Sequence, residues 1–335
     1  MSNIQKRATK NSAYNVYLNQ CVGNKEDYAV ENVGTTASLM AYMKAVLGMA
    51  KPHAGNVFFV DSGHAAAVNS TTNGLGQGTA PTLPFATIDF AIGACTANNG
   101  DVIYVLPGHT ETVAGAAGID FDVAGVKVIG LGHGPDRPTI TMSAVASTIH
   151  MDAIGSWLEN MLVKSTHDNT IVIDIDKADC TVKNCEFRYG SSKEWVDCIH
   201  IGGAGANACD RTSIIGCVFQ SIVAGSDTCI ELAEVADSVL IDSCICIGDF
   251  ADAAIHNPTG KVLTQLIIKD CLLENTQAGD HALELVSACT GQLIRNFYRT
   301  NALATAVDPG ACWSLNCYAC HAADASGLLT PAVDS

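Results

Sequence analysis

A short pattern that returns seven times between residues 157 and 320 constrains the fold of this chain more than any other feature. In each copy a strand-like segment is followed by a polar residue, an apolar residue and a second strand-like segment. The apolar positions are Met161, Cys185, Cys217, Cys244, Cys271, Phe297 and Cys317, spaced by 24, 32, 27, 27, 26 and 20 residues. Self-similarity at periods of about 20–50 residues signals a solenoid, and β-rich units with polar turns predict a parallel β-helix.

The stacking of successive coils explains both positions of the repeat. Coils lie about 4.8 Å apart, so equivalent positions form columns, and an inward column must be apolar and uniform in size. The position before it must turn the chain, which suits residues that adopt left-handed backbone conformations. These residues are Asn160, Asn184, Gly216, Ser243, Asp270, Asn296 and Asn316. We therefore predict an all-β chain with an apolar ladder beside an Asn-type ladder.

Charge and cysteine usage exclude several classes of protein. The 335-residue chain carries 18 Lys and Arg and a net charge of −16, which disfavours binding to nucleic acid and to anionic membranes. We find neither a membrane-spanning run nor a signal peptide in the sequence, and expect a protein made in a cytoplasm. Five of the 15 cysteines lie in the apolar column, so we interpret the cysteines as packed thiols rather than disulfides.

Residues 1–55 form a separate N-terminal region in this interpretation. Lys6, Arg7 and Lys10 make a small basic segment, which is either a disordered terminus or an arm that docks on an acidic partner. Residues 36–50 predict a helix with an apolar stripe at helical spacing. The stripe includes Leu39, Met43 and Val46. So short a helix needs a partner, either the end of the solenoid or its own copies in a trimer.

Residues 56–110 predict a strand, a Gly-rich loop, a short helix and a second strand. The residues that define this order are Asp61, Gly63, Pro84, Phe85, Thr87, Gly100, Asp101, Ile103, Val105, Pro107 and Gly108. The pattern resembles the N-terminal module of the pectin-lyase-like superfamily. This resemblance implies a right-handed parallel β-helix over residues 111–320, an α/β cap on its first coil and a tail at 321–335.

A second column lies before each Cys-type strand, at the centre of an apolar–polar–apolar triplet. Its residues are His150, Asp174, His200, Glu231, His256 and Glu284. Period-2 alternation places all six on the outer face of one sheet. We favour a ladder of mutually supporting side chains or a subunit interface, and a metal-binding or sugar-binding stripe and a catalytic His/acid pair remain alternatives. Burial between subunits would make assembly sensitive to pH near 6.5.

A Cys/His motif and several acidic clusters could each form a functional site. Cys317, Cys320 and His321 match a C-x-x-C-H haem-attachment sequence, or with Cys312 a zinc site, but a last coil explains them better. Acidic clusters could serve polysaccharide cleavage, but solvated turns explain them better. They are Asp120/Asp122, Asp174/Asp176/Asp179, Glu194/Asp197 and Asp249/Asp252. We therefore assign no catalytic residue, cofactor or metal ligand and expect no enzyme.

The combination of arm, helix, cap and solenoid resembles β-helical structural proteins of tailed bacteriophages, namely head decoration (cement) proteins and tailspike stems. This resemblance implies a homotrimer on the capsid surface of the virion that clamps neighbouring subunits of the major capsid protein. A tailspike would continue into a receptor domain, so the end of this sequence soon after its last coil favours decoration. A receptor-binding spike and a polysaccharide lyase or hydrolase are the alternative functions.

Overall fold

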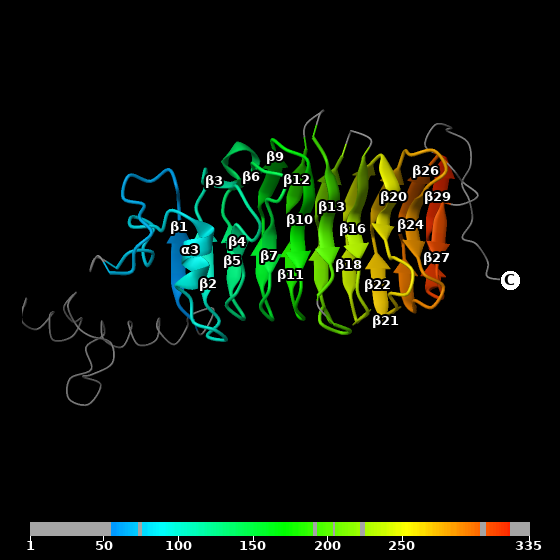
Figure 1. Ribbon diagram of the computed structural model, residues 1–335, viewed down its shortest axis with the longest axis horizontal. Helices are drawn as coiled ribbons and strands as arrows, with labels where there is room; N and C mark the ends of the chain where they lie inside the picture. The colour runs from blue at the N-terminus through cyan, green and yellow to red at the C-terminus, as the bar shows by residue number, and fades with distance from the viewer. Residues whose placement is uncertain are drawn as a thin grey trace, which may run out of the picture. The chain divides into compact units, whose positions relative to one another are not determined.

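The computed structural model describes residues 55–72, 76–189, 193–203, 205–221, 225–301 and 306–321, except for the side chain of His321. These residues form a series of stacked coils that runs from β1 to β29 (Figure 1). The tail was predicted at 321–335, but His321 ends strand β29, and residues 322–335 lie outside the described residues, as does the predicted attachment region. The candidate side chains of that region are Lys6, Arg7, Lys10, Leu39, Met43 and Val46.

Three parallel sheets form the walls of the stack, and successive strands from β2 onward join them in turn. The ten-strand sheet contains β1 (Val57–Val60), β2 (Val102–Val105), β5 (Lys127–Gly130), β8 (Trp157–Glu159), β11 (Thr181–Lys183), β14 (Ser213–Ile215), β18 (Leu240–Asp242), β22 (Leu266–Lys269), β25 (Gly291–Ile294) and β28 (Trp313–Leu315). The nine-strand sheet contains β3 (Thr110–Val113), β6 (Thr139–Met142), β9 (Leu162–Ser165), β12 (Glu186–Arg188), β15 (Val218–Gln220), β19 (Ile245–Gly248), β23 (Leu272–Asn275), β26 (Phe297–Thr300) and β29 (Tyr318–His321).

The third wall is an eight-strand sheet. Two coils also contribute a short extra strand, which follows the eight-strand sheet and precedes the ten-strand sheet in the sequence. The eight-strand sheet contains β4 (Ile119–Asp120), β7 (Ile149–Met151), β10 (Asn169–Ile175), β13 (Trp195–Ile201), β16 (Ser226–Leu232), β20 (Phe250–His256), β24 (His281–Leu285) and β27 (Val307–Pro309). The two-strand sheet pairs β17 (Ala236–Asp237) with β21 (Leu263–Thr264). The fold is therefore a parallel β-helix, as the repeat predicted.

The turn from the ten-strand to the nine-strand sheet explains why each repeat has a polar and then an apolar residue. Asn160 has a φ of 60° and Asn184 a φ of 52°, and the backbone N–H of each donates to a carbonyl of the next coil, at 3.0 and 2.8 Å. The left-handed residue turns the chain so that the following side chain points inward. Met161 and Cys185 are accordingly buried.

One prediction of the two columns is wrong by a single residue. Leu293, not Ile294, pairs with the inward-facing Ile268, so Arg295 takes the turn with a φ of 51°. Asn296 is then fully buried in the column that we predicted for Phe297, which is 36% exposed. The Asn296 carboxamide accepts from the N–H of Cys271 (3.0 Å) and donates to the Ile268 carbonyl (2.8 Å), so burial leaves its amide satisfied.

The described cysteines support the interpretation of packed thiols. All 14 of them are free, and most are buried. Burial raises the pKa of Cys180 to about 12 and that of Cys209 to about 11, which keeps both as unreactive thiols at neutral pH. Aromatic side chains stack along the same interior, where the rings of Phe187 and Phe219 lie 4.8 Å apart.

The cap at the first coil is built as the resemblance implied. Helix α3 (Ile88–Gly93) places its apolar face on the first strands, and a short 3-10 turn, η1 (Gly134–Asp136), follows later. Buried Asp101 accepts hydrogen bonds from the backbone N–H groups of Asn56 (2.6 Å) and Thr96 (2.7 Å) and ties the loops together. The described residues contain no helix long and apolar enough to cross a membrane.

Candidate functional site

The His/carboxylate column lies on the outer face of the eight-strand sheet, in the predicted register. The strand pairings also add one carboxylate at each end of it. In order the aligned residues are Asp120, His150, Asp174, His200, Glu231, His256, Glu284 and Asp308. Sequence analysis missed Asp120 and Asp308 as members, although each is the centre of an apolar–polar–apolar triplet like the others.

Short contacts join each central histidine to the carboxylate of the preceding coil. His200 Nδ1 lies 2.9 Å from Asp174 Oδ1, and His256 Nδ1 lies 2.8 Å from Glu231 Oε2. These four side chains are 12–26% exposed, so their charges are only partly screened by water. Because the paired residues come from different coils, each contact holds two adjacent strands together.

The carboxylates set the protonation of these histidines. Burial alone lowers the pKa of His200, but the hydrogen bond and charge of Asp174, with further negative charge nearby, raise it above its ordinary value of 6.5. His256 follows the same balance, with Glu231 as the principal partner that raises its pKa. The column therefore holds protonated histidines at a higher pH than free histidine would allow.

A group of carboxylates surrounds this part of the column. Burial, together with the charge of Glu231, raises the pKa of Asp197 to about 7, so this carboxyl is part-protonated at neutral pH. Burial and the charge of Asp252 likewise raise the pKa of Asp227. Asp197 belongs to one of the acidic clusters singled out in the sequence, and its neighbours come from other coils that sequence order does not bring together.

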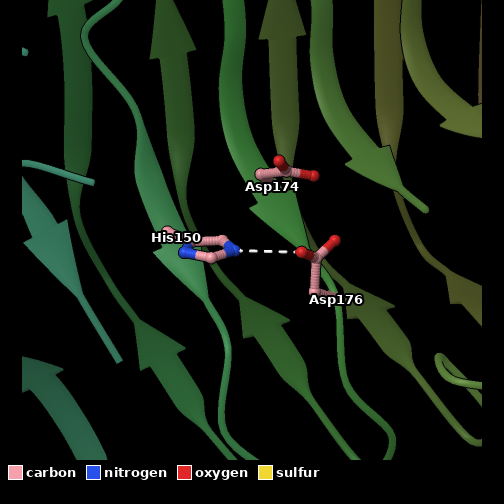
Figure 2. Close-up of side chains that lie close together, drawn as sticks. All are labelled: His150, Asp174 and Asp176. Carbon is pink, nitrogen blue, oxygen red and sulfur yellow. Dashed lines mark hydrogen bonds and ion pairs between the residues drawn. The ribbon is translucent and has the colours of Figure 1, made fainter. Parts of the chain in front are cut away.

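His150 differs from the other histidines of the column because carboxylates approach both of its nitrogens. Asp120 Oδ1 lies 3.5 Å from Nδ1, and Asp176 Oδ2 lies 3.1 Å from Nε2. Figure 2 shows the His150 ring directed at Asp176, with Asp174 beside it. The hydrogen bond and charge of Asp176 outweigh burial and raise the pKa of His150.

Other candidates from the sequence have structural partners instead. Asp179 forms a two-point ion pair with Arg211, at 2.7 and 2.8 Å, and so does not join Asp174 and Asp176. Cys317 is buried in the apolar column, as predicted for a last coil, and the side chain of His321 lies outside the described residues.

An apolar stripe on the outer face of the nine-strand sheet was not predicted. It consists of the residues that directly follow the last five buried column positions, and strand pairing aligns its members. From one end to the other these are Val218, Ile245, Leu272, Phe297 and Tyr318. Ile245, Phe297 and Tyr318 are 37, 36 and 43% exposed. The signal was available in the sequence, at the position after each column residue.

Two recesses lie away from the His/carboxylate column. One, of about 390 Å³, is lined by Trp313 and other residues of the ten-strand sheet and by polar residues of the adjoining turns, such as Gln265. The other, of about 420 Å³, gathers Arg137, Lys164 and Arg188 around Glu186, which contacts Arg137 at 2.9 Å. The second recess combines cations with a carboxylate, a combination that a site for acidic sugars would use.

No family model matches the chain, and no curated protein matches it either. Two solved structures align with part of the chain. A rhamnogalacturonan lyase aligns at 13% identity over 73% of this chain and 74% of its own, with a TM-score of 0.46. A protein described as Geobacillus virus E2 - ORF18 aligns at 11% identity over 90% of this chain and 69% of its own, with a TM-score of 0.31. The strand order itself shows a parallel β-helix, and neither likeness carries a function to this chain.

Proposed function

We propose that this protein is a structural component of a virion, a non-enzymatic decoration (cement) trimer on the head of a tailed bacteriophage. In this proposal it binds neighbouring subunits of the major capsid protein, and the N-terminal residues 1–50 provide the attachment. The sequence resemblance suggests this function, and the apolar stripe of the nine-strand sheet is the observation that carries it.

The direction of the stripe suits assembly with copies of the same chain. It crosses five adjacent strands, from β15 to β29, and follows the stacking direction over about 19 Å at the usual strand spacing. A partner that covers such a line must itself be extended along the stack. A second solenoid aligned with the first meets this requirement, because equivalent coils then lie at equal heights.

Charge favours the same face. Copies of a chain with a net charge of −16 repel each other unless the contact surface is locally neutral and apolar. The stripe offers such a surface, since only Glu186 in this column carries a charge between Leu162 and Tyr318. The column of the eight-strand sheet is charged, and its histidines already contact carboxylates of the same chain. The prediction that it forms a subunit interface stays a prediction.

The native mass of the purified full-length protein tests the proposal. Light scattering should give a mass near three chains, and the copy number per virion should then match a set of sites on the shell rather than a tail appendage. A monomer at micromolar concentration would overturn the trimer and with it this function.

A second candidate function, recognition or cleavage of an acidic polysaccharide, has two observations in its favour. On the eight-strand sheet, burial raises the pKa of Asp197 to about 7, which suits a general acid; separately, on the nine-strand sheet, the recess around Arg137 and Lys164 offers cations for a uronate. Binding of acidic oligosaccharides without release of new chain ends would indicate a receptor-binding spike. Turnover that disappears in Asp197→Asn would indicate an enzyme.

A further inference from the structure

The His/carboxylate column changes character at His150. The shortest contacts of His200 and His256 are each to one carboxylate, whereas His150 lies between Asp120 and Asp176. Asp176 follows β10 directly and, two residues after the column position, faces the same side of the sheet. The positions two residues after each column residue therefore form a second column beside the first, and Asp176 is its member at this coil.

We propose that His150, Asp174 and Asp176 form a binding site for a divalent metal ion, most favourably zinc. One donor atom from each residue lies within 4.8 Å of the other two, and no other group of three meets this condition among the described residues. His150 comes from β7, Asp174 from β10 and Asp176 from the position after β10, and Figure 2 shows His150 directed at Asp176 with Asp174 nearby. A bound ion would bridge two coils through three ligands.

The donor set and its spacing suit zinc. Zinc takes imidazole nitrogen and carboxylate oxygen at about 2.0–2.2 Å, usually in a tetrahedron, so two of its ligands lie roughly 3.3 Å apart. His150 Nε2 and Asp176 Oδ2 are already 3.1 Å apart, and an ion would take the place of the proton between them. All three side chains are 23–26% exposed, which leaves a fourth position open to water.

Two neighbours support the ligands as partners of metal-bound residues commonly do. Asp120 Oδ1 faces the other nitrogen of His150 at 3.5 Å and is buried without a hydrogen-bond partner. A carboxylate in this position orients the imidazole and strengthens it as a ligand. His200 Nδ1 contacts Asp174 Oδ1 at 2.9 Å, which fixes that carboxylate and leaves its second oxygen for the ion.

The adjacent coils explain why the site occurs at one level of the stack. The position that corresponds to Asp176 on the next coil is Gly202, where an added Cβ would lie 2.2 Å from the His200 ring. On the preceding coil the corresponding residue is Asp152, which forms an ion pair with Lys177. Among these three positions of the second column, Asp176 is therefore the carboxylate that contacts a histidine of the His/carboxylate column.

Zinc titration of the full-length protein, after treatment with a chelator and under reducing conditions, tests this site. Calorimetry should show one more Zn²⁺ bound per chain in the wild type than in His150→Ala. Zn²⁺ should also raise the melting temperature of the wild type and not that of the variant. Mg²⁺ and Ca²⁺ at the same concentration should leave the melting temperature unchanged, because the imidazole favours zinc.

Matched variants separate a metal site from a loss of folding. Asp176→Asn keeps the shape of the ligand and should also lose the ion, whereas His256→Ala, at another level of the column, should keep it. Asp120→Asn should weaken zinc binding by about 10–100-fold without changing the stoichiometry. Equal zinc stoichiometry in the wild type, His150→Ala and Asp176→Asn would overturn the proposal. A response to Ca²⁺ but not to Zn²⁺ would overturn the assignment of the ion.

Discussion

The outer faces of the eight-strand and nine-strand sheets are built from the same coils and have opposite chemistry. On the eight-strand sheet, histidines and carboxylates alternate and contact each other from coil to coil. On the nine-strand sheet, an apolar side chain follows each of the last five buried column residues, and these apolar side chains lie side by side from coil to coil. The histidines of the first face thus contact carboxylates of the same chain, and the second face presents apolar surface that burial against a partner would stabilise.

The largest effect is expected from a charge in the apolar stripe. Ile245→Lys should convert the trimer to a monomer, because equivalent lysines from three copies would meet in an apolar contact. Val196→Lys is the matched control, since Val196 is 38% exposed on the eight-strand sheet and Ile245 is 37% exposed. Light scattering should give one chain for the first variant and three for the second. The same mass for both would remove the stripe as the interface.

The next largest effect is expected from loss of a His/carboxylate contact between two coils of the eight-strand sheet. His256→Ala should lower the free energy of unfolding by about 1–3 kcal/mol, because it leaves Glu231, 12% exposed, without its hydrogen-bond partner. His281→Ala is the control, since His281 lies 3.6 Å from a more exposed Glu284 and its loss should change the free energy by less than about 0.5 kcal/mol. Denaturant unfolding measures both. Equal losses would show that the contacts of the column do not hold the coils.

Thermal stability should fall as the pH rises from 6 to 8. The pKa values of His150, His200 and His256 are raised in the folded state, so their contribution is complete below about 6.5 and is lost as the pH passes the folded values. The pKa of Asp197 is raised from 3.8 to about 7, so its contribution to stability is also lost as the pH rises between these two values. Asp197→Asn should flatten the melting temperature between pH 5 and 7. A melting temperature that rises over the range contradicts this account.

The smallest effect is expected on assembly. If copies meet through the apolar stripe, which contains few titratable groups, the native mass should stay constant from pH 5 to 8. If they meet through the His/carboxylate column, the mass should change near or above 6.5, where its histidines lose their protons. Light scattering across this range therefore distinguishes the two faces without any mutation.

The repeat made most of the fold predictable because each coil needs the same turn residue and the same buried apolar residue at equivalent positions. The left-handed turn residues and the buried column follow from backbone sterics and apolar packing, which act within a few residues. The prediction failed at Arg295 and Asn296 because it assumed that the apolar member of the pair points inward. Two hydrogen bonds from the neighbouring coil make the buried asparagine acceptable, and these bonds are not visible in the local sequence.

The sequence by itself determined the parallel β-helix, its N-terminal cap and the register of the His/carboxylate column, because period-2 alternation and coil length are local properties. Tertiary structure alone decided which partners meet: Asp176 with His150, Asp120 as the first rung of the column and Phe297 on the outer stripe. The physical reason is that coil lengths vary, so the residues that become neighbours across strands depend on how every turn between them closes. Side chains of neighbouring coils can interact only once the turns between them are formed, so these contacts depend on the folded stack rather than on the spacing along the chain.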